Sequence, residues 1–382
     1  ATQPGLGGGL AVFDITQGAG AASLLAVQGY PSFVQPVSAP QITLVPTLAG
    51  GGANLIATGP RPSGWASFAI TGSGGFGAPL NSALPFDPTA GTSAMIGRQS
   101  FVFLAPNGAA TPTSLLLQDN GALQQVGAPS TINSASPTTI SGLTVARVGA
   151  QSFLLAADPG QNSLTSFAIG GDGSLAYAAA MPAAGGVGMS QPSATVTLDQ
   201  FGTTYVIAAA TQSSSLSVFA LGATGAFMPV DHVVDNLTTR FAGASALTSL
   251  QSGDRGYVFA GGWDDGVEVM TILPDGRLID LMTIEDSAAM SLAHVSALAA
   301  GQVGGQIKLF AASATETGIT QLALNLGPQG ITLNGASGVQ TGTGANDLLI
   351  AGTGTSAIYG GAGDDILVAG GAGGGAILYG GS

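Results

Sequence analysis

The sequence predicts an all-β protein built from repeated modules, and three observations support this fold class. A pattern of hydrophobic residues followed by glycine recurs about every 52 residues, and self-similarity at such a period indicates an array of like modules. Short apolar runs surround each copy with the alternation of half-buried strands, and no segment has the period of an amphipathic helix. Glycine-rich turns separate these runs, as they do between short strands.

The repeated pattern, called the marker below, is a large apolar residue, any residue, an aliphatic residue and then a glycine four positions later. In its clearest copy Phe167 and Ile169 lead to Gly173, within a Gly-Asp-Gly sequence typical of a tight turn. With this copy there are seven, the first of them looser. The others are Phe13 with Ile15, Phe68 and Ile70 with Gly74, Leu115 and Leu117 with Gly121, Phe219 and Leu221 with Gly225, Met270 and Ile272 with Gly276, and Leu324 and Leu326 with Gly330.

Each module contains the pattern of four short strands. An apolar run such as Phe153 to Ala157 comes before the marker, a further strand such as Ser174 to Ala178 follows the turn, and another such as Ala194 to Leu198 precedes the next apolar run. Four strands in about 50 residues make the blade of a β-propeller, whereas the repeats of a β-solenoid are shorter. Seven markers predict seven blades. A six-bladed ring is the alternative, because the first module lacks its two leading strands.

The segments Tyr205 to Ala209, Ser217 to Leu221 and Gly225 to Phe227 resemble the lactonase-like seven-bladed propellers. That family includes phosphogluconolactonase and relatives of carboxymuconate cyclase. The resemblance covers roughly residues 10–333 and rests on strand patterning. It implies that polar and charged residues around one mouth of the central channel would carry any activity.

The glycine-rich tail contains a different repeat. Residues Gly360 to Val368 match the nonapeptide GGxGxDxUx, where U is a large aliphatic residue, and this resembles the hemolysin-type (RTX) calcium-binding family. Members of that family are secreted and fold as a parallel β-roll. We therefore expect a propeller over residues 1–335 and a short calcium-binding β-roll over residues 336–382 that continues beyond the last residue. The segment 344–351 resembles 52–57, so the first residues of the tail could also close the ring.

The resemblance, applied to the register of the tail repeats, implies one calcium site. The interior aliphatic positions are Leu349, Ile358, Leu367 and Leu378. In the family that the tail resembles, consecutive turns fall on opposite sides of the roll. Asp347 and Asp365 therefore share one side, while Ser356 and Ala376 on the other side supply no charge. Since Ca²⁺ takes several oxygen ligands, the resemblance implies one ion held by both aspartates and by the turns that contain Gly342, Gly344, Gly361 and Gly363. The alternative is a generic glycine-rich tail.

Composition limits the classes of partner. The chain has 20 acidic and 7 basic residues and a net charge of −13, which argues against binding to nucleic acid or to anionic membranes. It contains no cysteine, and no apolar run is as long as the ~20 residues of a membrane helix. With the hemolysin-type resemblance, these features favour a protein that is secreted or displayed on a bacterial cell surface.

Few residues suggest chemistry. By repeat alignment His294 enters the innermost strand of its module near a channel mouth, at the position of Gln191 and Gly243 in earlier modules, and Arg240 is nearby. These two residues are the catalytic candidates, although a structural role for His294 is favoured because general acid–base work needs a positioned partner. The acidic segment Trp263 to Glu268 could bind a cation or offer Trp263 as a ligand platform. It lacks the spacing of a calcium loop, so an ordinary blade loop is favoured.

We expect a secreted calcium-binding protein without enzymatic activity, whose propeller binds an extracellular or cell-surface protein or glycan. The alternative is a lactonase-like or cyclase-like hydrolase with an export tail. Assembly into surface layers or filaments is a third possibility, since the edges of a glycine-rich roll can stack. A hydrolase needs charged groups that converge at one site, and the chain has only 7 basic residues to supply them.

Overall fold

The computed structural model describes residues 9–15, 23–29, 41–46, 53–60, 63–127, 139–183, 187–369 and 375–381. Every regular element within these ranges is a β-strand, as the sequence predicts. These ranges accordingly contain no helix of the length and apolar character needed to cross a membrane. The chain forms two compact units, the second made mostly of residues from Ala323 onward. The two units are described separately below.

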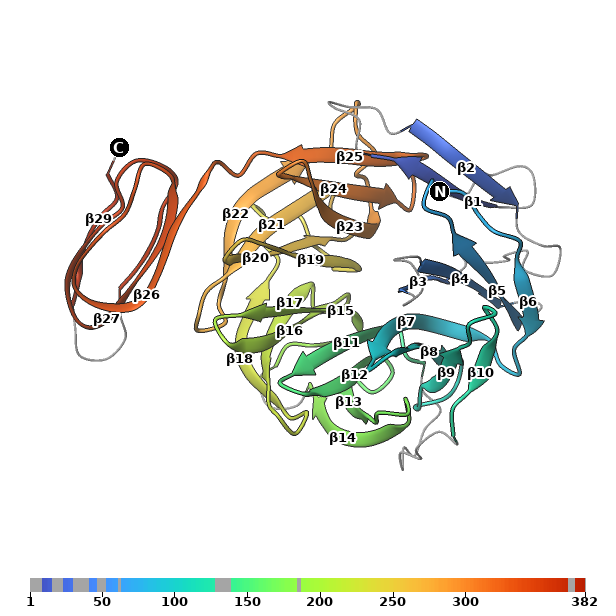
Figure 1. The fold of residues 1–382 in the computed structure, drawn as a ribbon. Helices are drawn as coiled ribbons and strands as arrows, with labels where there is room; N and C mark the ends of the chain where they lie inside the picture. Colours follow the sequence, from blue (N-terminus) through green and yellow to red (C-terminus); the bar gives the residue numbers. More distant parts are fainter. Residues whose placement is uncertain are drawn as a thin grey trace. The chain divides into compact units, whose positions relative to one another are not determined.

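The described strands of the first unit include six successive sheets that form the blades of a β-propeller (Figure 1). Five blades have four strands in chain order, and the sixth has three. Blade 1 contains β3 (Gln41–Pro46), β4 (Ala53–Pro60), β5 (Ser63–Ile70) and β6 (Leu80–Ala83). Blade 2 contains β7 (Pro88–Ile96), β8 (Gln99–Pro106), β9 (Thr113–Leu117) and β10 (Leu123–Gln125). Blade 3 contains β11 (Gly142–Val148), β12 (Gln151–Asp158), β13 (Ser163–Ile169) and β14 (Leu175–Pro182).

Blade 4 contains β15 (Pro192–Gln200), β16 (Thr203–Ala210), β17 (Ser215–Leu221) and β18 (Phe227–Val234). Blade 5 contains β19 (Ala246–Ser252), β20 (Arg255–Gly261), β21 (Gly266–Ile272) and β22 (Leu278–Glu285). Blade 6 contains β23 (Val295–Val303), β24 (Gln306–Ser313) and β25 (Ile319–Leu324). The first strands of successive blades, from β3 to β23, pack side by side, so they are the innermost strands.

Our expectation of seven blades is wrong, and the described strands form the six of the alternative. The first marker residue, Phe13, lies in β1 (Gly9–Asp14), which pairs with β2 (Ser23–Gly29) in a two-stranded sheet. Leu10 of this ribbon packs against Ala57 and Phe68 of blade 1. A two-stranded sheet lacks the inner strands of a blade and cannot form a full blade of its own. The β1–β2 ribbon therefore packs on blade 1. At the other end, Gly330 of the last marker lies in a strand and not in a turn.

The glycines of the other five markers lie in the predicted tight turns, with φ between +80° and +87°. In blades 3, 4 and 5 the turn glycine also meets an aromatic ring of the preceding blade. A Cβ atom on Gly225 would lie 2.8 Å from the Phe153 ring, one on Gly276 would lie 2.8 Å from Tyr205, and one on Gly173 would overlap Phe101. The aromatic residue and the glycine of the repeat are therefore contact partners in adjacent blades, and the apolar layers between blades form the core.

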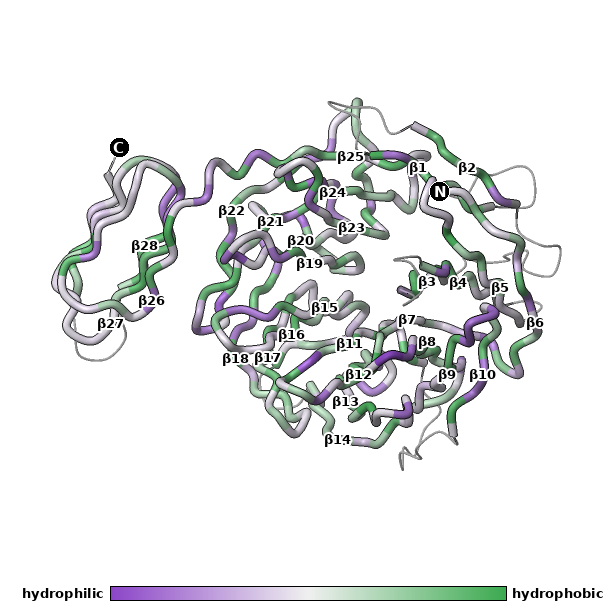
Figure 2. Tube along the Cα trace, viewed as in Figure 1, coloured by the Kyte–Doolittle hydropathy of each residue, from purple (hydrophilic) through white to green (hydrophobic). Residues whose placement is uncertain are grey.

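Hydroxyl groups link the innermost strands. Thr89, Ser141, Ser193 and Ser245 occupy the same position in four successive blades, at or just before the start of the inner strand. Each donates a hydrogen bond to a carbonyl of the next blade, at Ile140 (2.8 Å), Pro192 (2.8 Å), Ala244 (2.7 Å) and Val295 (3.2 Å). Neutral hydroxyl groups thus supply polar bonds between blades in a chain that has few charged residues. Figure 2 shows the same feature as a mostly pale and green chain with few strongly hydrophilic stretches.

The second unit is a stack of parallel strands. β26 (Gln329–Thr341) pairs in parallel with β27 (Asn346–Tyr359), and β27 pairs in parallel with β28 (Ile366–Val368) and β29 (Ile377–Tyr379). Leu349 lies opposite Leu367 and Ile358 opposite Leu378, so the expected interior positions fall in register. Leu349 and Ile358 are fully buried. Leu378, also expected in the interior, is 41% exposed, because its strand β29 pairs only with β27. The segment 344–351, which could have closed the ring, contributes instead to β27 and its pairing with β26 and β28.

Candidate functional site

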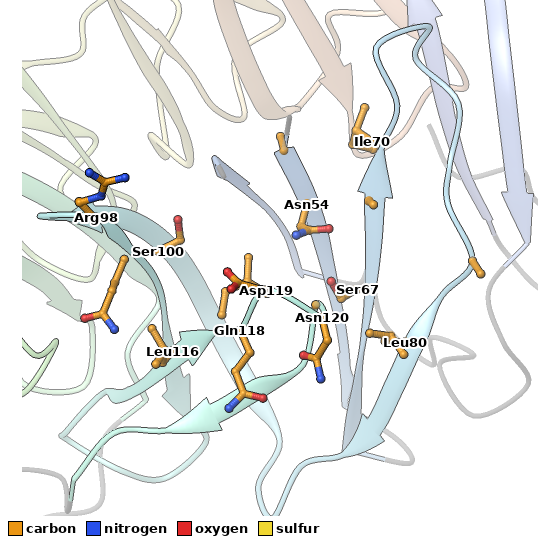
Figure 3. A pocket seen from close by; sticks show the side chains of 16 residues that line it. Asn54, Ser67, Ile70, Leu80, Arg98, Ser100, Leu116, Gln118, Asp119 and Asn120 are labelled. Atoms are coloured by element: carbon orange, nitrogen blue, oxygen red, sulfur yellow. The ribbon is translucent and has the colours of Figure 1, made fainter. Parts of the chain in front are cut away.

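A polar pocket of about 1070 Å³ lies between blades 1 and 2 (Figure 3). Ligand sites usually have volumes of ~300–1,000 Å³, so this pocket could accept a small molecule. Its polar lining consists of Asn54, Ser67, Arg98, Gln99, Ser100, Gln118, Asp119 and Asn120. Figure 3 shows Asp119 in the middle of this set, with Arg98 and Ser100 on one side and Asn54 and Ser67 on the other.

Tight turns hold the two charged residues of the pocket. Arg98 follows Gly97, whose φ is +62°, in the hairpin between β7 and β8. Asp119 lies at the tip of the marker turn between β9 and β10, which Gly121 closes by donating its N–H to the carbonyl of Gln118 at 2.8 Å. In a sheet of antiparallel strands in chain order, the first and third turns lie at the same end. The topology of blade 2 therefore places Arg98 and Asp119 on the same face of the propeller.

The pocket combines one carboxylate, one guanidinium and four amide side chains. A carboxylate can accept a proton from water, and a guanidinium can stabilise a developing oxyanion or bind an acidic group. Asparagine and glutamine both donate and accept hydrogen bonds, which suits a ligand with several hydroxyl groups. Sequence analysis missed this site. The only signal was the presence of charged residues beside the turn glycines Gly97 and Gly121.

The two residues proposed from the sequence as catalytic candidates are not joined by a hydrogen bond or ion pair. His294 is exposed just before β23, and its imidazole has no hydrogen bond within the described ranges. Arg240 lies between β18 and β19, where its Nη2 contacts Glu285 Oε1 at 2.5 Å and its Nη1 donates to the Thr239 carbonyl at 3.0 Å. Arg240 therefore contacts Glu285 and Thr239 and not His294, so the two candidates do not form an acid–base pair.

Glu268, at the end of the acidic segment, has a perturbed pKa. Burial raises the pKa of its carboxyl from 4.5 to about 7, the Thr283 hydroxyl opposes this rise by hydrogen bonding, and the nearby Asp280 adds to it. The side chain is fully buried, and Thr283 Oγ1 lies 3.0 Å from its Oε2. Because the Glu268 side chain is fully buried, a substrate cannot reach its carboxyl group. Glu268 is therefore a titratable group inside the blade and not a catalytic residue.

In the tail, Asp347 and Asp365 lie in successive turns on one side of the parallel stack. The Asp347 N–H donates to Asp365 Oδ1 at 2.9 Å. The Asp347 carboxylate is fully buried and accepts hydrogen bonds from the N–H groups of Ile331 and Thr343, both at 2.6 Å, and from the Thr343 hydroxyl at 3.0 Å. The protein therefore supplies partners for both carboxylate oxygens of Asp347.

Asp365 differs, because its Oδ2 atom is buried and has no hydrogen-bond partner among the described residues. Of the turn glycines expected near the ion, Gly361 and Gly363 have φ of +104° and +116°, and the N–H of Gly342 donates to the Tyr359 carbonyl at 2.8 Å. A Cβ atom on Gly344 would meet no atom within 4 Å. Within the described ranges, no group of three or more histidine or acidic side chains could hold a metal ion.

No family model and no curated protein matches the sequence, so comparison lends no support to the resemblance between the tail and hemolysin-type repeats. Solved structures do resemble the chain. A periplasmic gluconolactonase from Pseudomonas aeruginosa has a TM-score of 0.57 and 17% identity, with 84% of this chain and 92% of that chain covered.

Two further structures have the same kind of similarity. A putative 6-phosphogluconolactonase from Bacteroides fragilis has a TM-score of 0.55 and 14% identity, with 80% and 86% of the two chains covered. A protein from Lactobacillus plantarum has a TM-score of 0.56 and 17% identity, with 84% and 92% covered. At these identities the comparisons establish a β-propeller fold, and the neighbours themselves are lactonase-like propellers.

These neighbours contradict our main expectation of a secreted calcium-binding protein with a propeller for adhesion or surface assembly. Those with a described activity are a gluconolactonase and putative 6-phosphogluconolactonases, and this favours our alternative of a lactonase-like hydrolase over the main expectation. The sequence argument failed because it gave most weight to one nonapeptide in the tail. It also looked for charged catalytic residues only at the mouth of the central channel, and it did not consider a site between two blades.

Proposed function

We propose that the protein hydrolyses a sugar lactone in the pocket between blades 1 and 2. The observation that carries this proposal is the joint presence of Asp119, Arg98 and four amide side chains in one pocket of about 1070 Å³. A sugar lactone presents one carbonyl carbon for attack by water and several hydroxyl groups for recognition. The amides of Asn54, Gln99 and Asn120 suit the hydroxyl groups.

Each charged group has a role in this reaction. The Asp119 carboxylate accepts a proton from a water molecule while the water oxygen bonds to the lactone carbonyl carbon. The Arg98 guanidinium stabilises the negative charge that develops on the carbonyl oxygen. The tetrahedral intermediate then collapses, the bond from the carbonyl carbon to the ring oxygen breaks, and that oxygen takes the proton from Asp119. The product is an open-chain hydroxy acid.

The comparisons support sugar lactones as the class of substrate, but they do not identify a particular lactone. The propeller of this chain is similar to that of a gluconolactonase and of a putative 6-phosphogluconolactonase. The gluconolactonase is described as periplasmic, and we propose a location outside the cytoplasm for this chain as well.

The test is hydrolysis of glucono-1,5-lactone, measured as acid release with a pH indicator and corrected for spontaneous ring opening. Asp119→Asn and Arg98→Gln should each lower kcat by roughly 10²-fold or more, the size of a general-base or oxyanion contribution. Asp172→Asn is the matched control, because Asp172 is an exposed carboxylate in the corresponding turn of blade 3, outside the pocket. Absence of turnover on this lactone and on its 6-phosphate, or full activity in both pocket variants, would refute the proposal.

We also propose that the tail binds one Ca²⁺ through Asp365, with backbone carbonyls as further ligands. The supporting observation is the buried Asp365 Oδ2 atom without a partner, since an unpaired buried carboxylate oxygen is costly and a cation would satisfy it. A Cβ atom on Gly360 would meet both this oxygen and the Gly380 carbonyl, so a glycine keeps the space beside them open. Asp347 would add charge but already has protein partners.

Calorimetry with calcium tests this second proposal. Asp365→Ala should abolish the binding heat, and Asp364→Asn should leave it unchanged, because Asp364 is the exposed neighbour of Asp365. Calcium binding that survives in Asp365→Ala would show that the site is elsewhere. No binding by the unaltered protein would show that the tail is not a calcium-binding element.

A further inference from the structure

The propeller face opposite the lactone pocket carries an exposed tryptophan. Trp263 lies in the connection between β20 and β21, and its side chain is 63% exposed. The pocket uses the first and third turns of its blade, whereas this connection is the second turn, which lies at the other end of a blade with antiparallel strands in chain order. An indole left this open to solvent is unusual unless it serves a contact, because aromatic rings are the largest apolar groups available for burial.

A glycine supports one face of the indole. A Cβ atom on Gly243 would lie 2.5 Å from Trp263 Cδ2, 2.8 Å from Cε3 and 2.9 Å from Cε2. Cδ2 is one of the two fusion atoms of the rings, and the distances increase only slightly to Cε3 and Cε2, which are both bonded to it. This pattern arises when the approaching atom lies over the face of the ring and not at its edge. The indole therefore rests flat on the Gly243 backbone with its other face open.

The neighbouring blades show that the arrangement is particular to blade 5. Gln191, Gly243 and His294 occupy equivalent positions before the inner strands of blades 4, 5 and 6, all with positive φ, of +54°, +56° and +48°. The residues that correspond to Trp263 are Thr211 and Ala314, whose N–H groups donate to the carbonyls of Gln191 and His294. Of these three blades, only blade 5 has a large residue in the connection, and there the position before the inner strand is a glycine without a side chain.

Hydrogen bonds hold this connection in place before any ligand arrives. The Trp263 N–H donates to the Ala242 carbonyl at 2.6 Å, and the Ala242 N–H donates to Asp264 Oδ2 at 3.3 Å. The Gly243 N–H donates to Ser214 Oγ at 2.9 Å. A platform fixed in this way loses little conformational freedom on binding, which favours affinity.

We propose that Trp263 is the stacking platform of a carbohydrate-binding site on this face, separate from the lactone pocket. A pyranose ring with equatorial hydroxyl groups presents a flat face of C–H groups to an indole. Gln191 and His294 are exposed at the flanking rim positions, where they can hydrogen bond to hydroxyl groups. A cation is the other ligand that prefers an indole face, but cation sites usually enclose the charge with several aromatic rings. No second aromatic ring stacks on Trp263 in the described part of the chain.

The experiment uses the fact that the chain has two tryptophans, of which Trp65 is only 6% exposed. Iodide should quench the emission of Trp263, and cellohexaose, an oligomer of glucose with equatorial hydroxyl groups, should protect it. Calorimetry should find cellohexaose binding at least about tenfold weaker in Trp263→Ala, which is the upper range for an aromatic contact. Gly243→Asn should also weaken binding, since asparagine tolerates positive φ but fills the space beneath the ring.

Leu237→Ala is the matched control, because Leu237 is 97% exposed in the same connection that contains Gly243. It should leave cellohexaose binding unchanged, and Trp263→Ala should leave lactone hydrolysis unchanged. Unaltered binding in Trp263→Ala, no binding by the unaltered protein, or protection by tetramethylammonium in place of cellohexaose would each overturn the proposal.

Discussion

Replacing Glu268 with glutamine should remove a pH-dependent cost of folding. Burial raises the pKa of this carboxyl from 4.5 to about 7, and the Asp280 carboxyl raises it further while Thr283 and Arg240 lower it. An acid whose pKa is higher in the folded state holds its proton more tightly there than in the unfolded chain. Its favourable contribution to stability is therefore complete below pH 4.5 and is lost as the pH rises through 7.

The size of the effect follows from the difference between the two pKa values. At about 1.4 kcal/mol for each pKa unit, ionised Glu268 costs the folded protein about 3 kcal/mol above pH 7. Glutamine has a similar shape, can hydrogen bond to Thr283 and carries no charge. The Glu268→Gln variant should therefore match the unaltered protein near pH 4.5 and exceed its unfolding free energy by about 3 kcal/mol at pH 8.

Urea unfolding at a series of pH values from 4.5 to 8.5, followed by tryptophan emission, measures this difference. Glu285→Gln is the control, because Glu285 belongs to the same region but is 67% exposed in its ion pair with Arg240. An exposed ion pair contributes ~1 kcal/mol or less, so this variant should keep the pH dependence of the unaltered protein. Equal slopes against pH for Glu268→Gln and the unaltered protein would refute the claim that Glu268 is desolvated.

Four further substitutions test the contacts of the repeat and of the tail. Gly225→Ala should lower the unfolding free energy by about 2–4 kcal/mol, since φ is +81° and the new methyl would meet Phe153. Gly149→Ala, with φ +59° and open space, should cost only about 1 kcal/mol, and equal urea midpoints would refute the packing argument. Ser193→Ala should cost about 1–2 kcal/mol in thermal unfolding, because the Ala244 carbonyl loses its donor. Asp347→Ala should increase hydrogen exchange at the tail amides of Ile331 and Thr343 with or without calcium, and unchanged exchange would show that this carboxylate does not hold the turns.

Local features of the repeat were predictable from the sequence. The alternation around Phe167 and the glycine at position 173 specify a strand and a turn through contacts within one hairpin, and the structure has both. The repeat period predicted blades for the same reason, because each copy has the same four short strands. The aligned positions of Gln191, Gly243 and His294 also proved equivalent, down to the sign of φ.

The candidate sites were harder to predict. Arg98 and Asp119 carry no motif, and they share a pocket only because two turns of blade 2 face the strands of blade 1. Asp347 was recognisable as a tail residue with a regular spacing, but its partners are backbone N–H groups, which no side-chain pattern reveals. The flat contact between Trp263 and Gly243 joins two connections about 20 residues apart and likewise has no local signature.

The sequence by itself determined that the chain is all-β, that it repeats with a period of about 52 residues, and that its turns need glycine at fixed positions. These properties follow from hydrogen bonding and sterics within a few residues. The tertiary structure decided the number of blades, the pairing of three turn glycines with aromatic residues of the preceding blade, and the residues that meet in a pocket. Those outcomes depend on how separate sheets pack against one another. That packing is determined jointly by residues that are distant in the chain.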